Sequence, residues 1–160
     1  MSIFRADKKF ERFEDVTPEI LQQENVKLLL CDLDNTLTER MSKEPAEHLG
    51  AWIKACQKAG TEIVVISNNM SKKRVQRFCH PFKLHCVWWA KKPLSIHLTK
   101  ARKRFNMPNR NTAMLGDKWS TDVLAAKFAG IKAWKVEHRK GMLKDEQKEL
   151  KKEFLHDKKA

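Results

Sequence analysis

Two aspartates, one residue apart, follow an apolar run of the sequence. Asp32 and Asp34 come directly after residues 28–31 (Leu-Leu-Leu-Cys), so both carboxylates lie at the end of a hydrophobic segment and repel each other. This repulsion is tolerated mainly where a cation lies between the two groups. A calcium loop is excluded as the explanation, because its sixth position needs glycine and its twelfth glutamate, whereas this chain has Leu37 and Lys43 there.

Further polar residues follow other apolar runs of the chain. They are Ser67 and Asn68 after residues 62–66, Lys92 after residues 84–90, and Asp117 with Asp122 after residues 112–115. In an open parallel sheet the carboxyl ends of the strands meet at one edge, where reactive groups belong. We therefore expect these side chains to converge on Asp32 and Asp34.

The converging residue types are typical of phosphoryl transfer. Asp117 adds a third carboxylate, and a set of hard oxygen ligands suits Mg²⁺. Ser67 and the backbone amides near Asn68 can donate hydrogen bonds to phosphate oxygens, and Lys92 brings a fixed positive charge. The sequence therefore predicts a magnesium site that binds a phosphoryl group.

The two paired aspartates suit two different roles in such a reaction. An aspartate can act as a covalent nucleophile, which divides hydrolysis into formation of an aspartyl phosphate and its attack by water. We predict that Asp32 is this nucleophile, because it opens the motif directly at the strand end. Asp34 points the same way along an extended backbone, so it can protonate the leaving group and then deprotonate water.

The elements that must position these residues alternate between strand and helix. We expect strands over 26–31, 62–66, 84–90, 112–115 and 131–136, and helices over 17–24, 45–59, 71–79, 93–105 and 121–129. Right-handed crossovers between such strands require a mostly parallel sheet with helices on both faces. The fold class is therefore a doubly wound α/β fold. In the helix over 93–105 we expect Leu94 to face inward. Of the two neighbouring tryptophans, Trp88 and Trp89, we expect one ring to lie in the core and the other outside.

The length of the chain supports one compact domain. The protein has 160 residues, and we expect a single domain over 1–160 with its core at about 26–136, an N-terminal extension over 1–25 and a charged C-terminal helix over 139–160. No apolar run approaches the roughly 20 residues that cross a bilayer. We therefore expect no transmembrane segment, and we expect the protein to be cytoplasmic. The 4 cysteines have neither CxxC nor zinc spacing, which predicts reduced thiols.

Positive charge gathers in the middle third of the sequence. The net charge is +13, and the segment from Ile63 to Gly116 holds no Asp or Glu but twelve Lys or Arg residues. Such a segment attracts phosphates, nucleic acid or an anionic membrane, although a merely solvated face has a similar composition. We expect this segment, with its cluster over 102–104, to be the docking face for such a partner.

The motifs together resemble those of a known family. Residues 32–38 (Asp-Leu-Asp-Asn-Thr-Leu-Thr) match the first motif of the haloacid dehalogenase-like (HAD) superfamily, and its second, third and fourth motifs are matched in order by Ser67, Lys92 and Gly116-Asp117 with Asp122. Residues 66–69, 90–93 and 116–123 are similar to the YqeG branch of the HAD phosphatases. The resemblance covers about 26–136 and implies a HAD-like Rossmannoid core.

The resemblance also implies a role for each matched residue. Asp32 would attack phosphorus, Asp34 would be the acid and base, and Ser67 and Lys92 would hold the phosphoryl group. Mg²⁺ would be bound by Asp32, the Asp34 carbonyl and Asp117, with Asp122 in support. Lys91 competes with Lys92 for the third motif, and we prefer Lys92 because it directly precedes Pro93, as the lysine of the branch does.

The short gaps between motifs bear on the substrate. Residues 38–44 and 67–92 leave no room for a sizeable cap domain, so the site should be open to a phosphate carried on something bulky. Similarity to the YqeG branch implies phosphatidylglycerophosphate, with the protein peripheral on the inner face of an anionic membrane. Two alternatives stay open: a phosphatase of nucleotides or nucleic acid ends, and a non-catalytic nucleic-acid or ribosome binding module.

Overall fold

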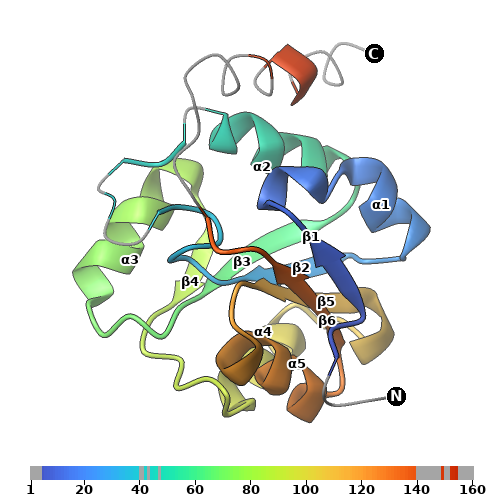
Figure 1. The fold of residues 1–160 in the computed structure, drawn as a ribbon, viewed down its shortest axis with the longest axis vertical. Helices are drawn as coiled ribbons and strands as arrows, with labels where there is room; N and C mark the ends of the chain where they lie inside the picture. The colour runs from blue at the N-terminus through green and yellow to red at the C-terminus, as the bar shows by residue number, and fades with distance from the viewer. Residues whose placement is uncertain are drawn as a thin grey trace.

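The strands of the protein form one parallel sheet. The computed structural model describes residues 5–39, 42, 44–46, 48–139, 149 and 152–154. Within these residues the sheet has six strands in the order β1-β6-β5-β2-β3-β4, and every neighbouring pair is parallel (Figure 1). The strands are β1 (Lys8–Phe10), β2 (Leu28–Cys31), β3 (Glu62–Ile66), β4 (His85–Val87), β5 (Thr112–Gly116) and β6 (Lys132–Val136).

Helices cover both faces of this sheet. The α-helices are α1 (Pro18–Gln23), α2 (Leu49–Lys58), α3 (Lys72–Cys79), α4 (Ile96–Arg104) and α5 (Leu124–Ala129). Two faces are visible in Figure 1, where α1 and α2 lie on one side of the sheet and α4 and α5 on the other. The predicted doubly wound α/β fold is confirmed, without a sizeable cap domain among the described residues.

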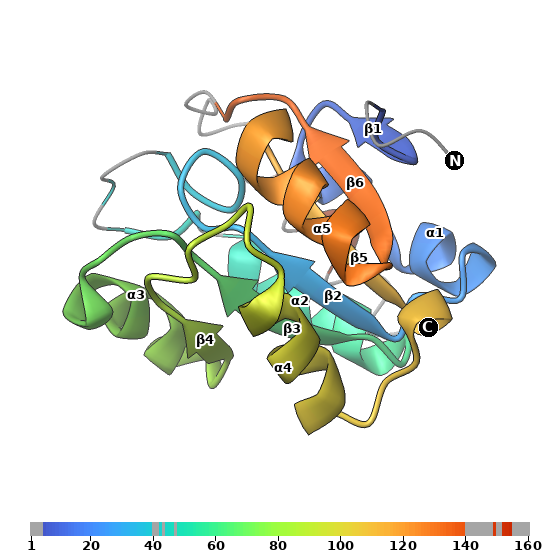
Figure 2. The same ribbon diagram turned by 90° about the horizontal axis from the view of Figure 1, so that it is seen from below.

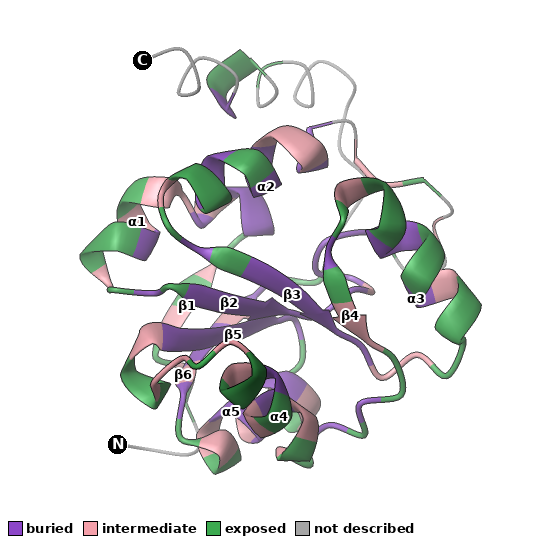
Figure 3. Cartoon of the chain, turned by 180° about the vertical axis from the view of Figure 1, so that it is seen from behind, coloured by how far each residue is buried: buried purple, intermediate pink, exposed green. Residues whose placement is uncertain are grey.

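The apolar run of β2 shows why the sequence folds this way. All four of its residues are buried, as expected of a central parallel strand that is covered on both faces (Figure 3). Side chains alternate along the strand, so Leu29 joins the hydrophobic cluster that holds Trp52 of α2. Leu28 and Leu30 join the opposite cluster with Leu98 of α4. Two separate cores therefore fix β2 in the middle of the sheet.

The chain leaves the sheet earlier after β4 than expected. The strand predicted over 84–90 ends at Val87, and Trp89 and Lys91 both have positive φ angles, +47° and +57°. These left-handed residues break the alternation that would have turned one side chain into the core. Consequently both Trp88 and Trp89 are exposed, and the prediction of one buried ring is wrong.

The following helix also begins later than expected. The helix predicted over 93–105 starts only at Ile96, because a turn closed by the Leu94 N–H and the Lys91 carbonyl precedes it. Leu94 is 58% exposed, so the prediction that it faces inward is wrong. Trp88, Trp89 and Leu94 therefore all lie on the surface near residue 90, although one ring and Leu94 were expected in the core.

The two ends of the described chain contain secondary structure that the hydrophobic periodicity of the sequence did not fully indicate. Residues 8–10 form β1, which pairs with β6 at the edge of the sheet, although a strand of three residues is too short to show a pattern. At the other end, residues 149 and 152–154 are helical and Arg139 is not, and the other residues of the helix predicted over 139–160 lie outside the described residues. None of the described helices has the length and apolar character that a membrane span requires.

Candidate active site

The carboxyl ends of the central strands enclose a cleft of about 190 Å³. The strand order places β2 between β3 and β5, so the residues that follow these strands are neighbours. The cleft is lined by Asp32, Asp34, Asn35, Ser67, Asn68, Asn69, Lys92, Asp117, Lys118 and Thr121. Asp122 lies behind this lining and is buried. The structure thus brings together the residues that the motifs singled out.

Lys92 lies at the centre of the cleft and is only 4% exposed. Its ammonium group donates to Asp32 Oδ1 at 2.9 Å and to Asp122 Oδ1 at 2.6 Å. Burial lowers the pKa of Lys92, but the two adjacent carboxylates outweigh burial and hold the pKa well above its usual range. The lysine therefore keeps its charge at neutral pH. Lys91 instead extends along the surface, with its Nζ 4.6 Å from the centroid of the Trp89 ring.

Asp32 is held at the end of β2 by contacts on both sides. Its backbone N–H donates to the Leu115 carbonyl of β5 at 2.9 Å, and Thr36 Oγ1 donates to its Oδ2 at 3.4 Å. Burial raises the pKa of the Asp32 carboxyl, although the Lys92 charge opposes the shift. The lysine therefore favours the charged carboxylate in a position that is largely shielded from water.

Three carboxylates could hold a metal ion. Asp32, Asp117 and Asp122 each offer a carboxylate oxygen, and these oxygens lie within 4.8 Å of one another. Burial raises the pKa of Asp122 to about 6, and Lys92 moderates this shift. Three buried carboxylates against one lysine leave an excess of negative charge, and a donor set of hard oxygens fits a small divalent cation. The side chain of Asp34 does not belong to this cluster, and ligation of a metal through the Asp34 carbonyl stays a prediction.

The Asp34 carboxylate has partners from the neighbouring strand end. Arg74 Nη2 lies 2.7 Å from Asp34 Oδ1, and Asn69 Nδ2 donates to Oδ2 at 3.4 Å. Sequence reasoning did not place Arg74 in the site. The available signal was local: Ser71 caps α3 by accepting from the Arg74 N–H at 3.2 Å, which puts the arginine in the first turn of a helix that starts beside the cleft.

Ser67 and Asn68 form the side of the cleft at the end of β3. Ser67 is buried, and its Oγ accepts a hydrogen bond from the Asn69 N–H at 3.0 Å. The Asn68 side chain binds the backbone of Lys92 twice, accepting from its N–H at 2.8 Å and donating to its carbonyl at 2.9 Å. The Asn68 side chain therefore positions the lysine, and the main-chain amide is the group of this residue that would contact phosphate.

A buried network ties the end of β6 to the loop that follows Asp32. Arg139 makes two hydrogen bonds to the Glu14 carboxylate, at 2.7 and 2.8 Å, and His48 Nε2 lies 2.7 Å from the same carboxylate. The Arg139 backbone N–H donates to the Asn35 carbonyl at 2.9 Å. Nothing in the sequence indicated this network, because its members lie far apart in the chain and only the fold brings them together.

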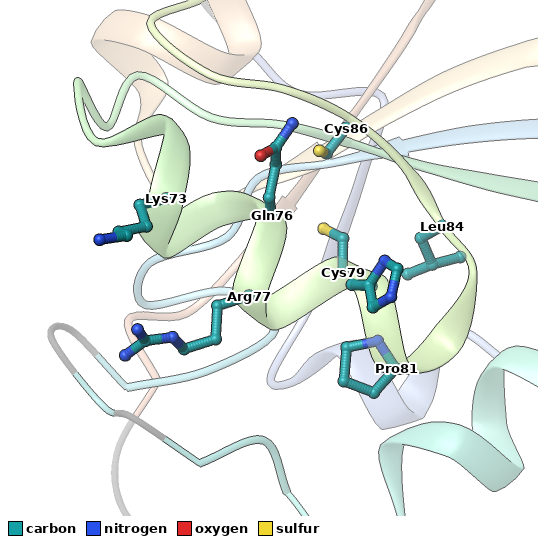
Figure 4. A pocket seen from close by; sticks show the side chains of 8 residues that line it. Lys73, Gln76, Arg77, Cys79, Pro81, Leu84 and Cys86 are labelled. Atoms are coloured by element: carbon teal, nitrogen blue, oxygen red, sulfur yellow. The ribbon is translucent and has the colours of Figure 1, made fainter.

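A larger cavity, of about 630 Å³, lies away from the cleft between α3 and β4 (Figure 4). It is lined by Lys73, Gln76, Arg77, Cys79, His80, Pro81, Leu84 and Cys86. No carboxylate belongs to this lining. The chemistry that the motifs predict therefore belongs to the smaller cleft rather than to the larger cavity.

Gly116 permits the approach of Asp122 to Lys92. A Cβ atom at position 116 would overlap the Asp122 carboxylate. We expect Gly116→Ala to displace Asp122 and to lower kcat by about 10²-fold, because a shift of about 1 Å in an active site has effects of that size. Steady-state kinetics would measure the loss. Gly50→Ala is the matched control, since its added carbon meets only the flexible ring of Phe82, at 3.3 Å. Unchanged kinetics for Gly116→Ala would contradict this account.

Glu14 should make the stability of the protein depend on pH. Burial raises its pKa, but the hydrogen bonds from His48 and Arg139 outweigh burial and bring the pKa down to about 2, from 4.5. A lowered pKa stabilises the fold above the unfolded value, so this contribution, roughly 3 kcal/mol, should disappear as the pH falls from about 4.5 to about 2.

Glu14→Gln should therefore destabilise the protein at neutral pH and flatten the pH dependence of the free energy of unfolding in that acidic range. Removing one partner of a buried pair costs about 3–5 kcal/mol, because Arg139 would be left buried without its counter-charge. Urea unfolding over the pH range measures both effects, with the exposed Glu11→Gln as control. Equal stability of the two variants would contradict the proposed importance of the network.

Comparison with known proteins gives two sequence matches. Residues 89–157 match the family model described as HAD-hydrolase-like. A curated Bacillus subtilis (strain 168) protein, named "Probable phosphatase YqeG", is 29% identical over 127 residues, which cover 79% of this chain and 73% of the relative.

Solved structures share the fold at low sequence identity. The cobalt-bound deoxy-D-mannose-octulosonate 8-phosphate phosphatase of Haemophilus influenzae superposes with a TM-score of 0.58 and 15% identity, covering 85% of this chain and 91% of that one. The 4-nitrophenylphosphatase of Thermotoga maritima superposes with a TM-score of 0.54 and 11% identity, covering 76% and 90%. At such identities the likeness concerns the fold alone.

Proposed function

We propose that the chain is a phosphatase of the HAD-like family and that it removes the terminal phosphate of phosphatidylglycerophosphate through an aspartyl phosphate on Asp32. The observation that carries this proposal is the contact of the buried Lys92 ammonium with Asp32 at 2.9 Å. Burial raises the pKa of the Asp32 carboxyl, and the Lys92 cation opposes that rise and so favours the ionised form, which is the form that can attack phosphorus.

In the first step Asp32 attacks the phosphorus of the substrate. A bond forms between a carboxylate oxygen and phosphorus while the bond from phosphorus to the ester oxygen breaks. The leaving alkoxide takes a proton from the Asp34 carboxyl. Lys92 and the Ser67 hydroxyl would stabilise the negative charge on the transferring group.

In the second step water releases the phosphate. Asp34, now ionised, takes a proton from a water molecule, which attacks the phosphorus of the aspartyl phosphate. The bond between phosphorus and the Asp32 oxygen breaks, and the free carboxylate is restored. Arg74 Nη2, at 2.7 Å from Asp34 Oδ1, would hold that carboxylate in place between the two steps.

A magnesium ion is the cofactor that suits this site. Asp32, Asp117 and the Asp34 carbonyl would hold it, with Asp122 in support, and the three buried carboxylates already supply the hard oxygens that it needs. When bound, Mg²⁺ neutralises charge on the phosphate oxygens and orients them.

The openness of the cleft supports a substrate whose phosphate is carried on a large group. The described residues between β2 and α2 form no helix or strand, and the segment from β3 to Lys92 holds only α3, a short 3₁₀ turn and β4. The described residues therefore form no lid that would limit the size of the substrate at these two places. A terminal phosphomonoester on a lipid headgroup fits such a cleft, and it is the substrate that the resemblance of the motifs to the YqeG branch implies.

Substitution of the two motif aspartates tests the mechanism. Asp32→Asn should fold normally and lose activity by a factor of about 10⁴ or more, because the covalent route disappears with the nucleophile. Asp34→Asn should lose less, about 10²- to 10⁴-fold, since it removes acid and base assistance alone. Phosphate release under saturating substrate measures both. Activity of Asp32→Asn within about tenfold of wild type would rule out its assignment as nucleophile.

A substrate panel tests the proposed substrate and the metal together. We expect Mg²⁺-dependent phosphate release to be fastest from phosphatidylglycerophosphate, compared with a nucleoside monophosphate, a 5′-phosphorylated oligonucleotide and a sugar phosphate. EDTA should stop the reaction and excess Mg²⁺ should restore it. Faster release from the nucleotide or oligonucleotide would replace the lipid with that alternative, and no release from any ester would favour a non-catalytic binding module. Full activity in EDTA after dialysis would contradict the assignment of Asp117 as a metal ligand.

A further inference from the structure

Exposed apolar side chains are concentrated in one short part of the chain. Among the described residues, six large apolar side chains are exposed, and five of them lie between residues 70 and 96. We call these five the apolar rim: Met70 (72% exposed), Trp88 (36%), Trp89 (50%), Leu94 (58%) and Ile96 (53%). The sixth, Phe128, belongs to α5. Exposed apolar groups that gather in this way mark interaction surfaces, whereas scattered ones do not.

The apolar rim lies beside the active-site cleft. The Trp89 N–H donates to the Asn69 carbonyl at 2.8 Å, and the Ala90 N–H donates to the Ser67 carbonyl at 2.9 Å. The segments that carry the rim therefore run alongside each other, and each also carries a residue of the cleft, Ser67 in one and Lys92 in the other. Figure 2 shows the chain after β4 passing next to the loop that follows β2.

Lysines accompany the two tryptophans. The Lys72 ammonium lies 4.9 Å from the centroid of the Trp88 ring, and the Lys91 ammonium lies 4.6 Å from that of Trp89. No acidic residue occurs between positions 63 and 116, so no carboxylate of this segment offsets their charge. Tryptophan rings together with lysines are typical of groups that sit at the headgroup level of a bilayer.

We propose that the apolar rim, with Lys72 and Lys91, rests on the surface of an anionic bilayer, so that a lipid phosphate enters the cleft directly behind it. This inference rests on the proposed function. Lysines near an anionic surface contribute roughly 1 kcal/mol each, and shallow insertion of the tryptophan, leucine and isoleucine side chains would add an apolar contribution.

Other occupants of this surface fit less well. A second copy in an isologous contact would place the surface that holds Lys72 and Lys91 against the same surface of the partner. The positive charges of the two surfaces would repel each other. Single-stranded nucleic acid stacks on aromatic rings, but Met70, Leu94 and Ile96 have no aromatic face to offer a base. A bilayer accepts both the aliphatic and the aromatic side chains and attracts the lysines.

The proposed docking surface does not include the basic cluster over 102–104, which was expected from the sequence to take part. These residues end α4, and Arg102 Nη1 donates to the Met107 carbonyl at 2.9 Å, near the amino ends of the strands. Because the cleft lies at the carboxyl ends, this cluster is at the opposite edge of the sheet. Lys103 and Arg104 there are exposed cations that serve as a matched control.

Vesicle sedimentation of the full chain tests the inference. Wild type should pellet with vesicles of phosphatidylglycerol and phosphatidylcholine at low salt, pellet less as salt rises, and stay in solution with pure phosphatidylcholine. Two double variants should each weaken vesicle binding by more than about tenfold. One combines Trp88→Ser with Trp89→Ser, and the other combines Lys72→Glu with Lys91→Glu. The control pair Lys103→Glu with Arg104→Glu, and the exposed apolar control Phe128→Ser, should bind as wild type does.

Activity separates this inference from the proposed function. All these variants should hydrolyse 4-nitrophenyl phosphate as wild type does, because none of the changed residues belongs to the catalytic set. Wild type that hydrolyses a short-chain lipid phosphate in solution but ignores anionic vesicles would overturn docking and leave the proposed function standing. If the wild-type protein binds vesicles through the apolar rim but does not hydrolyse the lipid phosphate, the proposed substrate is wrong and the proposed docking is still supported.

Three other results would overturn the inference in favour of a different surface or partner. Rim variants that pellet as wild type does would clear these residues of a docking role. A concentration-dependent dimer that the Trp88→Ser and Trp89→Ser pair abolishes would assign the rim to a second copy. Tight binding of a single-stranded oligonucleotide, lost in the same pair while vesicles are ignored, would assign it to nucleic acid.

Discussion

A single buried ammonium group holds the active site together. Lys92 Nζ lies 2.9 Å from Asp32 and 2.6 Å from Asp122, and the ammonium group would be costly to bury without a carboxylate partner. The three residues follow β2, β4 and β5, so their contact aligns the carboxyl ends of separate strands. Gly116 is part of the same constraint, because a side chain there would occupy the place of the Asp122 carboxylate. The arrangement that stabilises Lys92 is also the one that would present Asp32 to a phosphate in the proposed reaction.

Much of this architecture could be predicted from the sequence, because it depends on strong local patterns. The run of residues 28–31 is apolar without alternation, as a strand buried on both faces requires, and the structure places it in the centre of the sheet. The parallel order then puts every strand end at one edge. Asp32, Ser67, Lys92 and Asp117 follow four such ends, so topology alone predicted their convergence around one cleft.

What could not be predicted depends on left-handed residues and on contacts between distant parts of the chain. Trp88 and Trp89 are exposed because the backbone turns at Trp89, with a φ of +47°, and no periodicity signals a positive φ at a tryptophan. Arg74 was one of twelve cations in an acid-free segment, and the Ser71 cap that puts it in the first turn of α3 puts Lys72 and Lys73 there as well. The pairing of Glu14 with Arg139 spans almost the whole described chain, and only the sheet order brings the two ends together.

The central claim, that Asp32 carries the phosphate, is tested most directly by trapping the covalent intermediate. In Asp34→Asn the second step lacks its base, whereas 4-nitrophenolate leaves without needing a proton, so the first step can proceed with that ester. After an acid quench, mass spectrometry of the peptides should find phosphate on the peptide that holds Asp32, and hydroxylamine should remove it. The account predicts nearly stoichiometric phosphate on Asp32. Steady release of 4-nitrophenolate without any covalent phosphate, or phosphate on another residue, would contradict it.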